Sequence, residues 1–334
     1  MTSYCFLYYL DILSNRLRVV SVSLACFTLL TLYAEPLRVV SYNVENLFHP
    51  KHDTIWEPNP DLSFQRRENF IEKDDYEWTP EGERRWSYTR YYRKVENIAR
   101  VLTNIGEWGG IDVLGLQEVE NALCVKRLCY TLRHGEYDFV HYESPDPRGI
   151  DVALIYKKAR IDTLCTRAIS IPLLPTRDIL YVEALADKKD TLHLFVCHLP
   201  SQRGGAAESE WKRNAAKAVL QGAIDSVYAA YPNAKIIVMG DFNGAPKEDL
   251  RGVKNRMKEL KGTHKYQGRW TCLDHFYTSP SLDSLSRAEI YNAAWIQEPD
   301  EKYLDLKPKR TYNGFRYQKD GFSDHLPIVL TISL

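Results

Sequence analysis

This chain of 334 residues contains five short polar segments, each at the end of an apolar run typical of a β-strand. They limit the possible folds of the chain more than any other feature of the sequence. They occur in a fixed order and are Ser41–Asn46, Gly115–Glu120, His198–Pro200, Gly240–Asn243 and Ser323–Pro327. Each supplies a carboxylate, amide or imidazole suited to holding a divalent metal, moving a proton or contacting a phosphate. These side chains can act together only if the fold gathers them at one rim, around one bound cation.

The apolar runs and their periodicity predict an α/β architecture. Alternating or continuous apolar residues predict strands over residues 37–42, 111–116, 150–156, 192–197, 235–239, 270–277 and 328–332. Helical spacing predicts one helix that begins at Thr79–Pro80, a second over about Asn121–Arg133, and a third over Glu208–Ala230 with Trp211 on its inward face. The polar stretch 49–78 has no steady period and is interpreted as a long surface loop. Two central sheets flanked by helices are the simplest arrangement of these elements.

The N-terminus is interpreted as a targeting segment, residues 1–34. Arg16 and Arg18 precede the uncharged apolar stretch Val19–Tyr33, and Ala34 stands before a polar break, as in a secretory signal peptide. The stretch is short for a membrane span of about 20 residues. A retained anchor and a buried first strand are the alternatives. We expect one domain over residues 35–334 and a secreted or periplasmic protein.

Composition limits the partners of the chain. Lysine and arginine together number 44 and so do aspartate and glutamate, which gives a formal net charge of zero. The general basic footprint of a nonspecific nucleic-acid binder is therefore absent, although a local basic patch remains compatible with a nucleic-acid substrate. Outside the targeting segment, Cys124 and Cys129 are close enough for a bridge, but small buried thiols are the preferred interpretation. No heptad run or linker indicates a dedicated protein partner, so we expect a monomer.

Two of the polar segments carry acidic side chains suited to metal and water chemistry. Glu118 ends an apolar strand, where a carboxylate is a good ligand for a hard cation, although a solvated acid at a strand end is the ordinary alternative. Asp241 and Asn243 flank Phe242, and the period of two places both polar groups on one side. The aspartate can accept a proton from an attacking water, and the amide of Asn243 can donate to a phosphoryl oxygen.

The histidines are candidates for contacts with phosphate. His325 can donate to a nonbridging oxygen and stabilise negative charge, with Asp274 as the partner that fixes its tautomer and keeps it protonated. Asp324 is a candidate to orient that loop or approach the metal. His198 closes another strand and is placed as a second phosphate contact, with a buried structural histidine as the alternative. Among the arginines, Arg148 and Arg203 are the first candidates to bind phosphate oxygens.

The ordered set resembles the endonuclease/exonuclease/phosphatase superfamily, whose members include pancreatic deoxyribonuclease, abasic-site endonucleases, inositol polyphosphate phosphatases and sphingomyelinases. The resemblance covers about Leu37 to Leu334 and rests on the segments quoted above together with Asp274. It implies a four-layer α/β/β/α sandwich similar to deoxyribonuclease I, with the site at one edge of the packed sheets. Ser41–Phe48, with Thr79–Arg93, is also similar to secreted bacterial members of unassigned substrate.

The resemblance also implies roles for individual residues. Mg²⁺ or Mn²⁺ would be held chiefly by Glu118, with Asn43 beside it. Asp241 would orient or deprotonate the attacking water, while Asn243 and His198 hold the phosphoryl group. His325, supported by Asp274, would stabilise developing charge.

The sequence departs from parts of the superfamily in ways that concern the substrate. His198-Leu199-Pro200 replaces the Asn-x-Tyr-x-Pro-Asn element of the abasic-site enzymes, and Pro200-Ser201-Gln202 replaces the Ala-x-His of inositol phosphatases. We therefore expect a divalent-metal-dependent phosphodiester hydrolase, nuclease-like, with nucleic acid as the first substrate class. The alternative on the same catalytic frame is a phosphomonoesterase or a lipid or inositol-phosphate phosphodiesterase.

Overall fold

The computed structural model describes residues 35–51, 75–202, 204–205, 207–244 and 249–334, and Leu37–Ile332 form one compact unit. The predicted targeting segment 1–34 and Arg203 lie outside the described residues. Within the described part of the chain, no helix is long and apolar enough to cross a membrane. Cys124 and Cys129 are both buried and are not joined by a disulfide, in agreement with the preferred interpretation of the sequence.

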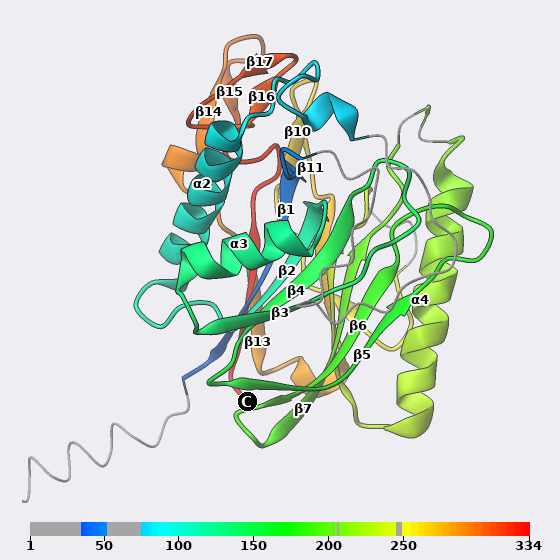
Figure 1. The fold of residues 1–334 in the computed structure, drawn as a ribbon. Coiled ribbons are helices and arrows are strands. Elements are labelled where there is room, and N and C mark those ends of the chain that lie inside the picture. Colours follow the sequence, from blue (N-terminus) through cyan, green and yellow to red (C-terminus); the bar gives the residue numbers. More distant parts are fainter. Residues whose placement is uncertain (1–34, 52–74, 203, 206, 245–248) are drawn as a thin grey trace, which may run out of the picture. The chain divides into compact units, whose positions relative to one another are not determined.

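Two large mixed sheets form the centre of the unit (Figure 1). Among the described residues, the spatial order of the first sheet is β13 (Ser286–Ile290), β18 (Ile328–Ile332), β1 (Leu37–Leu47), β2 (Val113–Val119), β4 (Asp151–Lys157) and β3 (Tyr137–His141). That of the second sheet is β5 (Ile161–Ile169), β6 (Ile179–Ala186), β7 (Asp190–His198), β8 (Lys235–Asp241), β12 (Asp274–Thr278) and β9 (Lys254–Asn255). In each sheet one central pair, β1–β2 or β7–β8, is parallel.

The remaining elements are helices and short hairpins. The helices are α2 (Tyr88–Gly106), α3 (Ala122–Leu132) and α4 (Glu210–Ala230), with 3-10 turns η1 (Tyr76–Trp78), η2 (Pro280–Leu282) and η3 (Ala294–Ile296). The hairpins pair β10 (His264–Tyr266) with β11 (Arg269–Thr271), β14 (Gln297–Asp300) with β15 (Asp305–Pro308), and β16 (Tyr312–Asn313) with β17 (Arg316–Tyr317).

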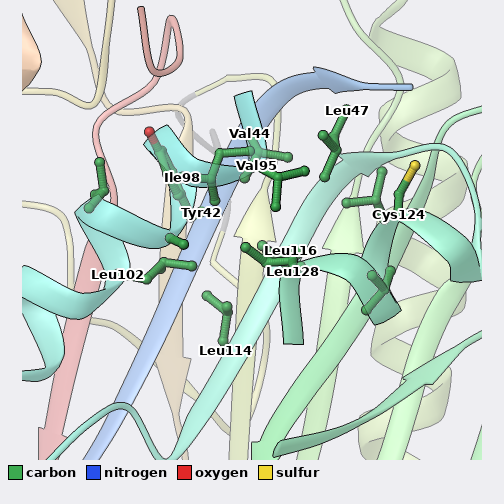
Figure 2. Packing of buried hydrophobic residues seen from close by; sticks show 14 of the residues in the cluster. Tyr42, Val44, Leu47, Val95, Ile98, Leu102, Leu114, Leu116, Cys124 and Leu128 are labelled. Atoms are coloured by element: carbon green, nitrogen blue, oxygen red, sulfur yellow. The ribbon is translucent and has the colours of Figure 1, made fainter. Parts of the chain in front are cut away.

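The helices cover the outer faces of the two sheets and complete four layers. One buried cluster joins α2 and α3 to the first sheet, where Ile98 and Leu128 pack near Leu114 and Leu116 (Figure 2). A second buried cluster joins α4 to the second sheet. Figure 1 accordingly shows α2 and α3 on one side and α4 on the other. This arrangement confirms the predicted α/β/β/α sandwich.

The inner faces of the sheets approach closely at a glycine of β2. Strand β2 contacts β7 and β8 of the second sheet. A Cβ atom on Gly115 would lie 2.7 Å from Sδ of Met239 and 3.3 Å from a methyl carbon of Val196. The glycine therefore leaves room for Met239 to fill the space between the sheets, just before the polar segments that end β2 and β8.

The start of the first predicted helix was wrong. Helix α2 begins at Tyr88, and the side chain of Ser87 accepts a hydrogen bond from the backbone N–H of Arg90 at 3.4 Å. The hydroxyl of Thr79 instead accepts from the N–H of Gly82 at 3.0 Å and closes a turn. A Cβ on Gly82 would lie 2.1 Å from the carbonyl oxygen of Tyr76, so this turn requires glycine at that position.

The inward face of the third predicted helix was also partly wrong. Trp211 of α4 is 59% exposed, whereas Ala216, Leu220 and Ile224 are buried. The face that packs on the sheet is rotated from the predicted one because the aliphatic residues, rather than the bulky aromatic at the helix start, face the sheet.

Candidate active site

Backbone irregularities shape the ends of β1 and β2. The β1–β2 register shifts between Asn43 and Leu47, and the β2–β4 register shifts between Gln117 and Val119. Within these bulges Asn46 and Glu118 have left-handed φ angles of 55° and 63°. Bulges of this kind redirect side chains at sheet edges. The two segments bond to each other, since the Glu118 carboxylate accepts from the N–H of Asn46 at 2.9 Å.

Strand pairing in the second sheet brings three functional side chains to the same level. His198, the last residue of β7, is the register partner of Asp241, the last residue of the parallel strand β8. On the other side of β8, Asp274 begins β12 and is also paired with Asp241. A row of histidine, aspartate and aspartate therefore crosses the end of the sheet, although 76 positions separate His198 from Asp274 (274 − 198).

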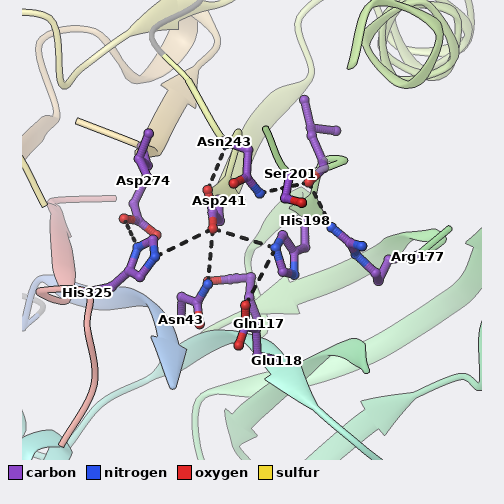
Figure 3. Close-up of polar contacts among 12 residues, drawn as sticks. Asn43, Gln117, Glu118, Arg177, His198, Ser201, Asp241, Asn243, Asp274 and His325 are labelled. Carbon is purple, nitrogen blue, oxygen red and sulfur yellow. Dashed lines mark hydrogen bonds and ion pairs between the residues drawn. The ribbon is translucent and has the colours of Figure 1, made fainter. Parts of the chain in front are cut away.

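The carboxylate of Asp241 is the centre of the site (Figure 3). Its Oδ2 accepts from Nδ2 of Asn43 at 3.0 Å and lies 3.6 Å from Nε2 of His198 and 3.8 Å from Nε2 of His325. Its Oδ1 accepts from the backbone N–H of Asn243 at 2.7 Å. Figure 3 shows Asp241 between the two imidazoles. Side chains from both sheets thus meet on a single carboxylate oxygen.

The two histidines beside Asp241 have opposite electrostatic character. Burial alone would lower the pKa of His325, but the charges of Asp274 and Asp241 raise it well above its usual value. The Nδ1 of His325 contacts Oδ2 of Asp274 at 2.8 Å. For His198, burial and then the charge of Arg177 hold the pKa well below its usual value. The site therefore pairs a cationic imidazole with a neutral one.

Asp241 itself has a pKa near neutrality. Burial raises the pKa of this carboxyl to about 7, and the charge of Asp274 adds to the rise while His325 opposes it. A group with a pKa near the working pH exchanges protons most effectively. Asp241 is consequently suited to take a proton from a water molecule held beside it.

Glu118 provides an oxygen donor for a cation. Its Oε1 lies 3.9 Å from Nη2 of Arg148 and 4.0 Å from Nε2 of His198, beyond hydrogen-bond distance from either. Its side chain is 14% exposed, so it reaches the surface of the site. Together with the amide of Asn43, this set of hard oxygen donors fits Mg²⁺ or Mn²⁺.

The remaining predicted residues have other contacts. Asn243 donates through Nδ2 to the carbonyl of Leu199 at 2.9 Å, so its amide is held beside the site. Arg148 lies at the rim and donates to Oδ1 of Asn46 at 3.0 Å. Asp324 accepts from Nη2 of Arg310 at 2.9 Å, and that guanidinium helps hold the carboxyl pKa at about 2 despite burial. This contact pairs Asp324 with an arginine, whereas the sequence analysis offered it as a residue that orients the loop or approaches the metal.

A buried network beneath the site was missed from the sequence. Glu45 accepts from Nε of Arg310 at 3.1 Å and from the N–H of Thr311 at 2.6 Å. The ammonium of Lys94, on α2, lies 3.8 Å from Glu45 and donates to the carbonyl of Phe322 at 2.7 Å. Glu45 lies in the first polar segment, but Lys94 and Arg310 stand in no recognisable motif. The network holds Phe322 and Asp324, in the segment that leads to His325.

Thr263 is a further residue that the sequence did not single out. Its hydroxyl donates to the carboxylate of Asp274, the same group that holds His325. The next residue, His264, forms an isolated antiparallel β-bridge with His325, and the centroids of the two imidazole rings are 4.9 Å apart. The Asp274–His325 pair is therefore held from two sides.

Comparison with known proteins places this geometry in context. A family model described as the endonuclease/exonuclease/phosphatase family matches residues 38–334. Among solved structures, truncated TDP2 from Caenorhabditis elegans is similar with a TM-score of 0.56 and 17% identity, covering 90% of this chain and 98% of that one. No curated protein matches.

Two further solved structures are similar. A mannosyl-6-phosphatase from Bacteroides thetaiotaomicron has a TM-score of 0.52 and 15% identity, covering 88% of this chain and 98% of that one. The human Nocturnin catalytic domain has a TM-score of 0.53 and 17% identity, covering 90% and 94%. Identities this low show a shared fold alone.

Proposed function

The chain belongs to the endonuclease/exonuclease/phosphatase family of divalent-metal-dependent phosphoesterases, and on that premise we propose that it is a phosphodiester hydrolase that acts on nucleic acid. The observation that carries the proposal is the meeting of Asn43, His198 and His325 within 3.0–3.8 Å of one oxygen of Asp241. A carboxylate base between a neutral and a cationic imidazole is suited to hydrolysis of a phosphoester without a covalent intermediate.

The roles of the residues follow from their contacts. Asp241 orients a water and accepts its proton, while Asn43 holds the carboxylate in place. His325, kept cationic by Asp274, donates to a nonbridging phosphoryl oxygen and stabilises the charge that grows there. His198, which is neutral, donates a second hydrogen bond to the phosphoryl group without repelling the cation beside it.

Glu118 and Asn43 are the residues that would hold Mg²⁺ or Mn²⁺. The bound cation supplies Lewis-acid stabilisation of the phosphate and the leaving oxygen. Arg148, at the rim next to Glu118, is placed to contact a phosphate oxygen. Arg203, which lies outside the described residues, is proposed for a similar contact.

A phosphomonoesterase is the second candidate function. One similar structure carries the name mannosyl-6-phosphatase, and it has nearly the same fold coverage as the others. The formal net charge of zero also gives this chain no general attraction to a polyanion. Monoester and diester substrates must therefore be tested together.

The cellular setting is part of the proposal. The positive flank and apolar run within residues 1–34 support export, so we infer that the protein is secreted or periplasmic and works there as a monomer. Mature-terminus sequencing of protein from the culture supernatant and the periplasm would test this, and intact protein confined to the cytoplasm would contradict it.

The experiment that tests the function is a substrate screen with Mg²⁺ or Mn²⁺. Supercoiled DNA, single-stranded RNA, bis-nitrophenyl phosphate, mannose 6-phosphate, inositol phosphates and sphingomyelin are compared. We expect diester cleavage by the wild type and almost none by Asp241→Asn. The matched control is Asp162→Asn, an exposed aspartate of β5, which keeps wild-type activity. Hydrolysis of monoesters alone would select the second candidate, and undiminished activity of Asp241→Asn would refute the assignment.

A further inference from the structure

A group of side chains that could hold a metal ion lies at the end of the β3–β4 pair. His141, Glu143 and Asp151 each offer a ligand atom, and these atoms lie within 4.8 Å of one another. His141 is paired with Ala153 in the antiparallel register. The same register continued for two residues sets Glu143 opposite Asp151. Since alternate residues share a face, all three side chains stand on one side of the sheet.

That side is the face covered by the helices rather than the face between the sheets. Ala153 and Ile155, which alternate with Asp151 along β4, pack in the buried cluster with α2 and α3. The group therefore shares no side chain with the Asp241 site, where residues of both sheets meet.

Three polar atoms of His141 and Asp151 are buried without hydrogen bonds. The side chains of His141 and Asp151 are 0% and 3% exposed. Within the residues that the structure describes, neither ring nitrogen of His141 nor Oδ2 of Asp151 has a hydrogen-bond partner. Leaving such atoms without hydrogen bonds destabilises the folded state, so buried groups of this kind call for an explanation.

The distance between the two groups fits a shared cation better than a hydrogen bond. Nε2 of His141 lies 3.4 Å from Oδ2 of Asp151, longer than the usual range of about 2.7–3.2 Å for a hydrogen bond. Two ligands of a tetrahedral zinc, each about 2.0–2.1 Å from the metal, are about 3.4 Å apart. An imidazole with two carboxylates is also a donor set that suits Zn²⁺ rather than Mg²⁺.

We propose that His141, Glu143 and Asp151 form a binding site for a divalent transition metal of the Zn²⁺ class, separate from the catalytic cation. The metal takes Nε2 of His141, Oδ2 of Asp151 and a carboxylate oxygen of Glu143, with water completing the coordination. It satisfies the buried atoms that have no hydrogen bond. This proposal is independent of the proposed hydrolase activity.

The site would close the loop that carries Arg148 to the rim. His141 and Glu143 stand at one end of residues 142–150, and Asp151 stands at the other. Inside this loop Asp146 accepts from the N–H of Arg148 at 2.9 Å and from Nη1 of the buried Arg177 at 2.7 Å. A metal that joins both ends of the loop would limit its motion and stabilise the position of Arg148 beside Glu118.

The test measures zinc binding directly. The full chain, freed of metal by chelation, is titrated with ZnCl₂ in excess Mg²⁺, and bound zinc is counted by mass spectrometry. We expect one equivalent in the wild type and in Glu118→Gln, which removes the catalytic ligand. His141→Gln and Glu143→Gln should bind at least about tenfold more weakly. The exposed His134→Gln is the matched control and should bind like the wild type.

Thermal unfolding gives a second readout. Zinc at about 100 times its dissociation constant should raise the Tm of the wild type by about 5 °C and leave that of His141→Gln unchanged. Circular dichroism checks that each variant is folded. If His141→Gln is unfolded, the zinc binding of Glu143→Gln tests the proposal in its place. A wild type that retains no zinc, or a folded variant that binds zinc as tightly as the wild type, would overturn the proposal. Loss of zinc from Glu118→Gln would overturn it too, because that loss would place the metal at the catalytic site.

Discussion

Asp241 and Asp274 lie directly opposite each other on antiparallel strands β8 and β12, and one imidazole, that of His325, contacts both carboxylates. Two buried acids at adjacent positions would repel each other if both were ionised and unpaired. The cationic ring offsets this repulsion, and its Nδ1 contact with Asp274 turns its Nε2 toward Asp241. The pair of acids and the histidine therefore function as one unit.

Substitution of Asp274 should weaken catalysis through His325. Asp274→Asn removes the largest influence that raises the pKa of His325, so the ring loses its proton at lower pH. We expect kcat to fall by about 10²–10⁴-fold and the alkaline limb of the pH–rate profile to move to lower pH. Asp162→Asn is the control. A reduced kcat with an unmoved alkaline limb would mean that Asp274 does not act through His325.

Removal of the Glu118 charge should weaken the response to metal. Glu118→Gln keeps the hydrogen-bond acceptor for Asn46 but loses a negative oxygen beside the site. We expect the Mg²⁺ concentration for half-maximal activity to rise by about 100-fold, since loss of even an outer-shell partner costs about 10–100-fold. Metal titrations of the rate check this. Superimposable curves for the variant and the wild type would remove Glu118 from the metal site.

A methyl group at Gly240 should separate the strands that carry His198 and Asp241. Gly240 has a φ of +140°, and a Cβ there would lie 1.9 Å from the carbonyl oxygen of Cys197. Because that oxygen belongs to the backbone, β7 and β8 must move apart. We expect Gly240→Ala to lose several kcal/mol of unfolding free energy, above the roughly 1–2 kcal/mol of left-handed strain alone.

The matched control for that substitution is Gly135→Ala. Gly135 also has a positive φ, +83°, but nothing lies within 4 Å of the place that its Cβ would take. Gly135→Ala should therefore lower the unfolding free energy through backbone strain alone. Urea unfolding of both variants separates the two effects. Equal losses of stability would show that the close approach of β7 and β8 is not limiting.

Acid should destabilise the protein partly through His193. Burial lowers the pKa of this ring, which lies 2.9 Å from the hydroxyl of Tyr181. In the unfolded chain the ring titrates near about 6.5, so the unfolded state binds more protons as the pH falls through that value. The stability of the wild type should therefore decrease from about pH 7.5 to about pH 5 more steeply than that of His193→Asn.

The control for this pH experiment is a histidine that remains exposed in the folded protein. His134→Gln changes an exposed ring, and its stability curve should run parallel to that of the wild type. Unfolding free energies from urea titrations at each pH give the comparison. Parallel curves for the wild type and His193→Asn would show that burial of this ring does not couple to folding.

The sequence predicted strand ends well and strand partners poorly. Polar residues after apolar runs marked Asp241 and His198, because a strand that leaves the core must stop being apolar. Nothing local marks their pairing in register, which depends on the packing of two distant segments. Strand β5 was missed because much of this edge strand is exposed, so its apolar pattern is weak. Strand β6 was missed although it is largely apolar and buried.

Long-range electrostatic partners were equally hard to predict. Arg310 and Lys94 meet Glu45 only in the folded chain, from positions 265 and 49 residues away (310 − 45 and 94 − 45). From the sequence, any of the 44 basic residues could have paired with Glu45, and their spacing along the chain does not distinguish them. The sequence therefore indicated which acids could react, while the fold decides which cations hold them.

The place of β18 between β13 and β1 in the first sheet has a consequence for biosynthesis. His325 lies just before this strand, which follows every other strand of the sheet in the sequence, so the sheet can close only after the rest of it has been synthesised. A nascent or prematurely terminated product has Asp241 and His198 but lacks the cationic ring. Hydrolytic competence should thus arrive only once Ile328–Ile332 has been synthesised and has paired with its neighbours.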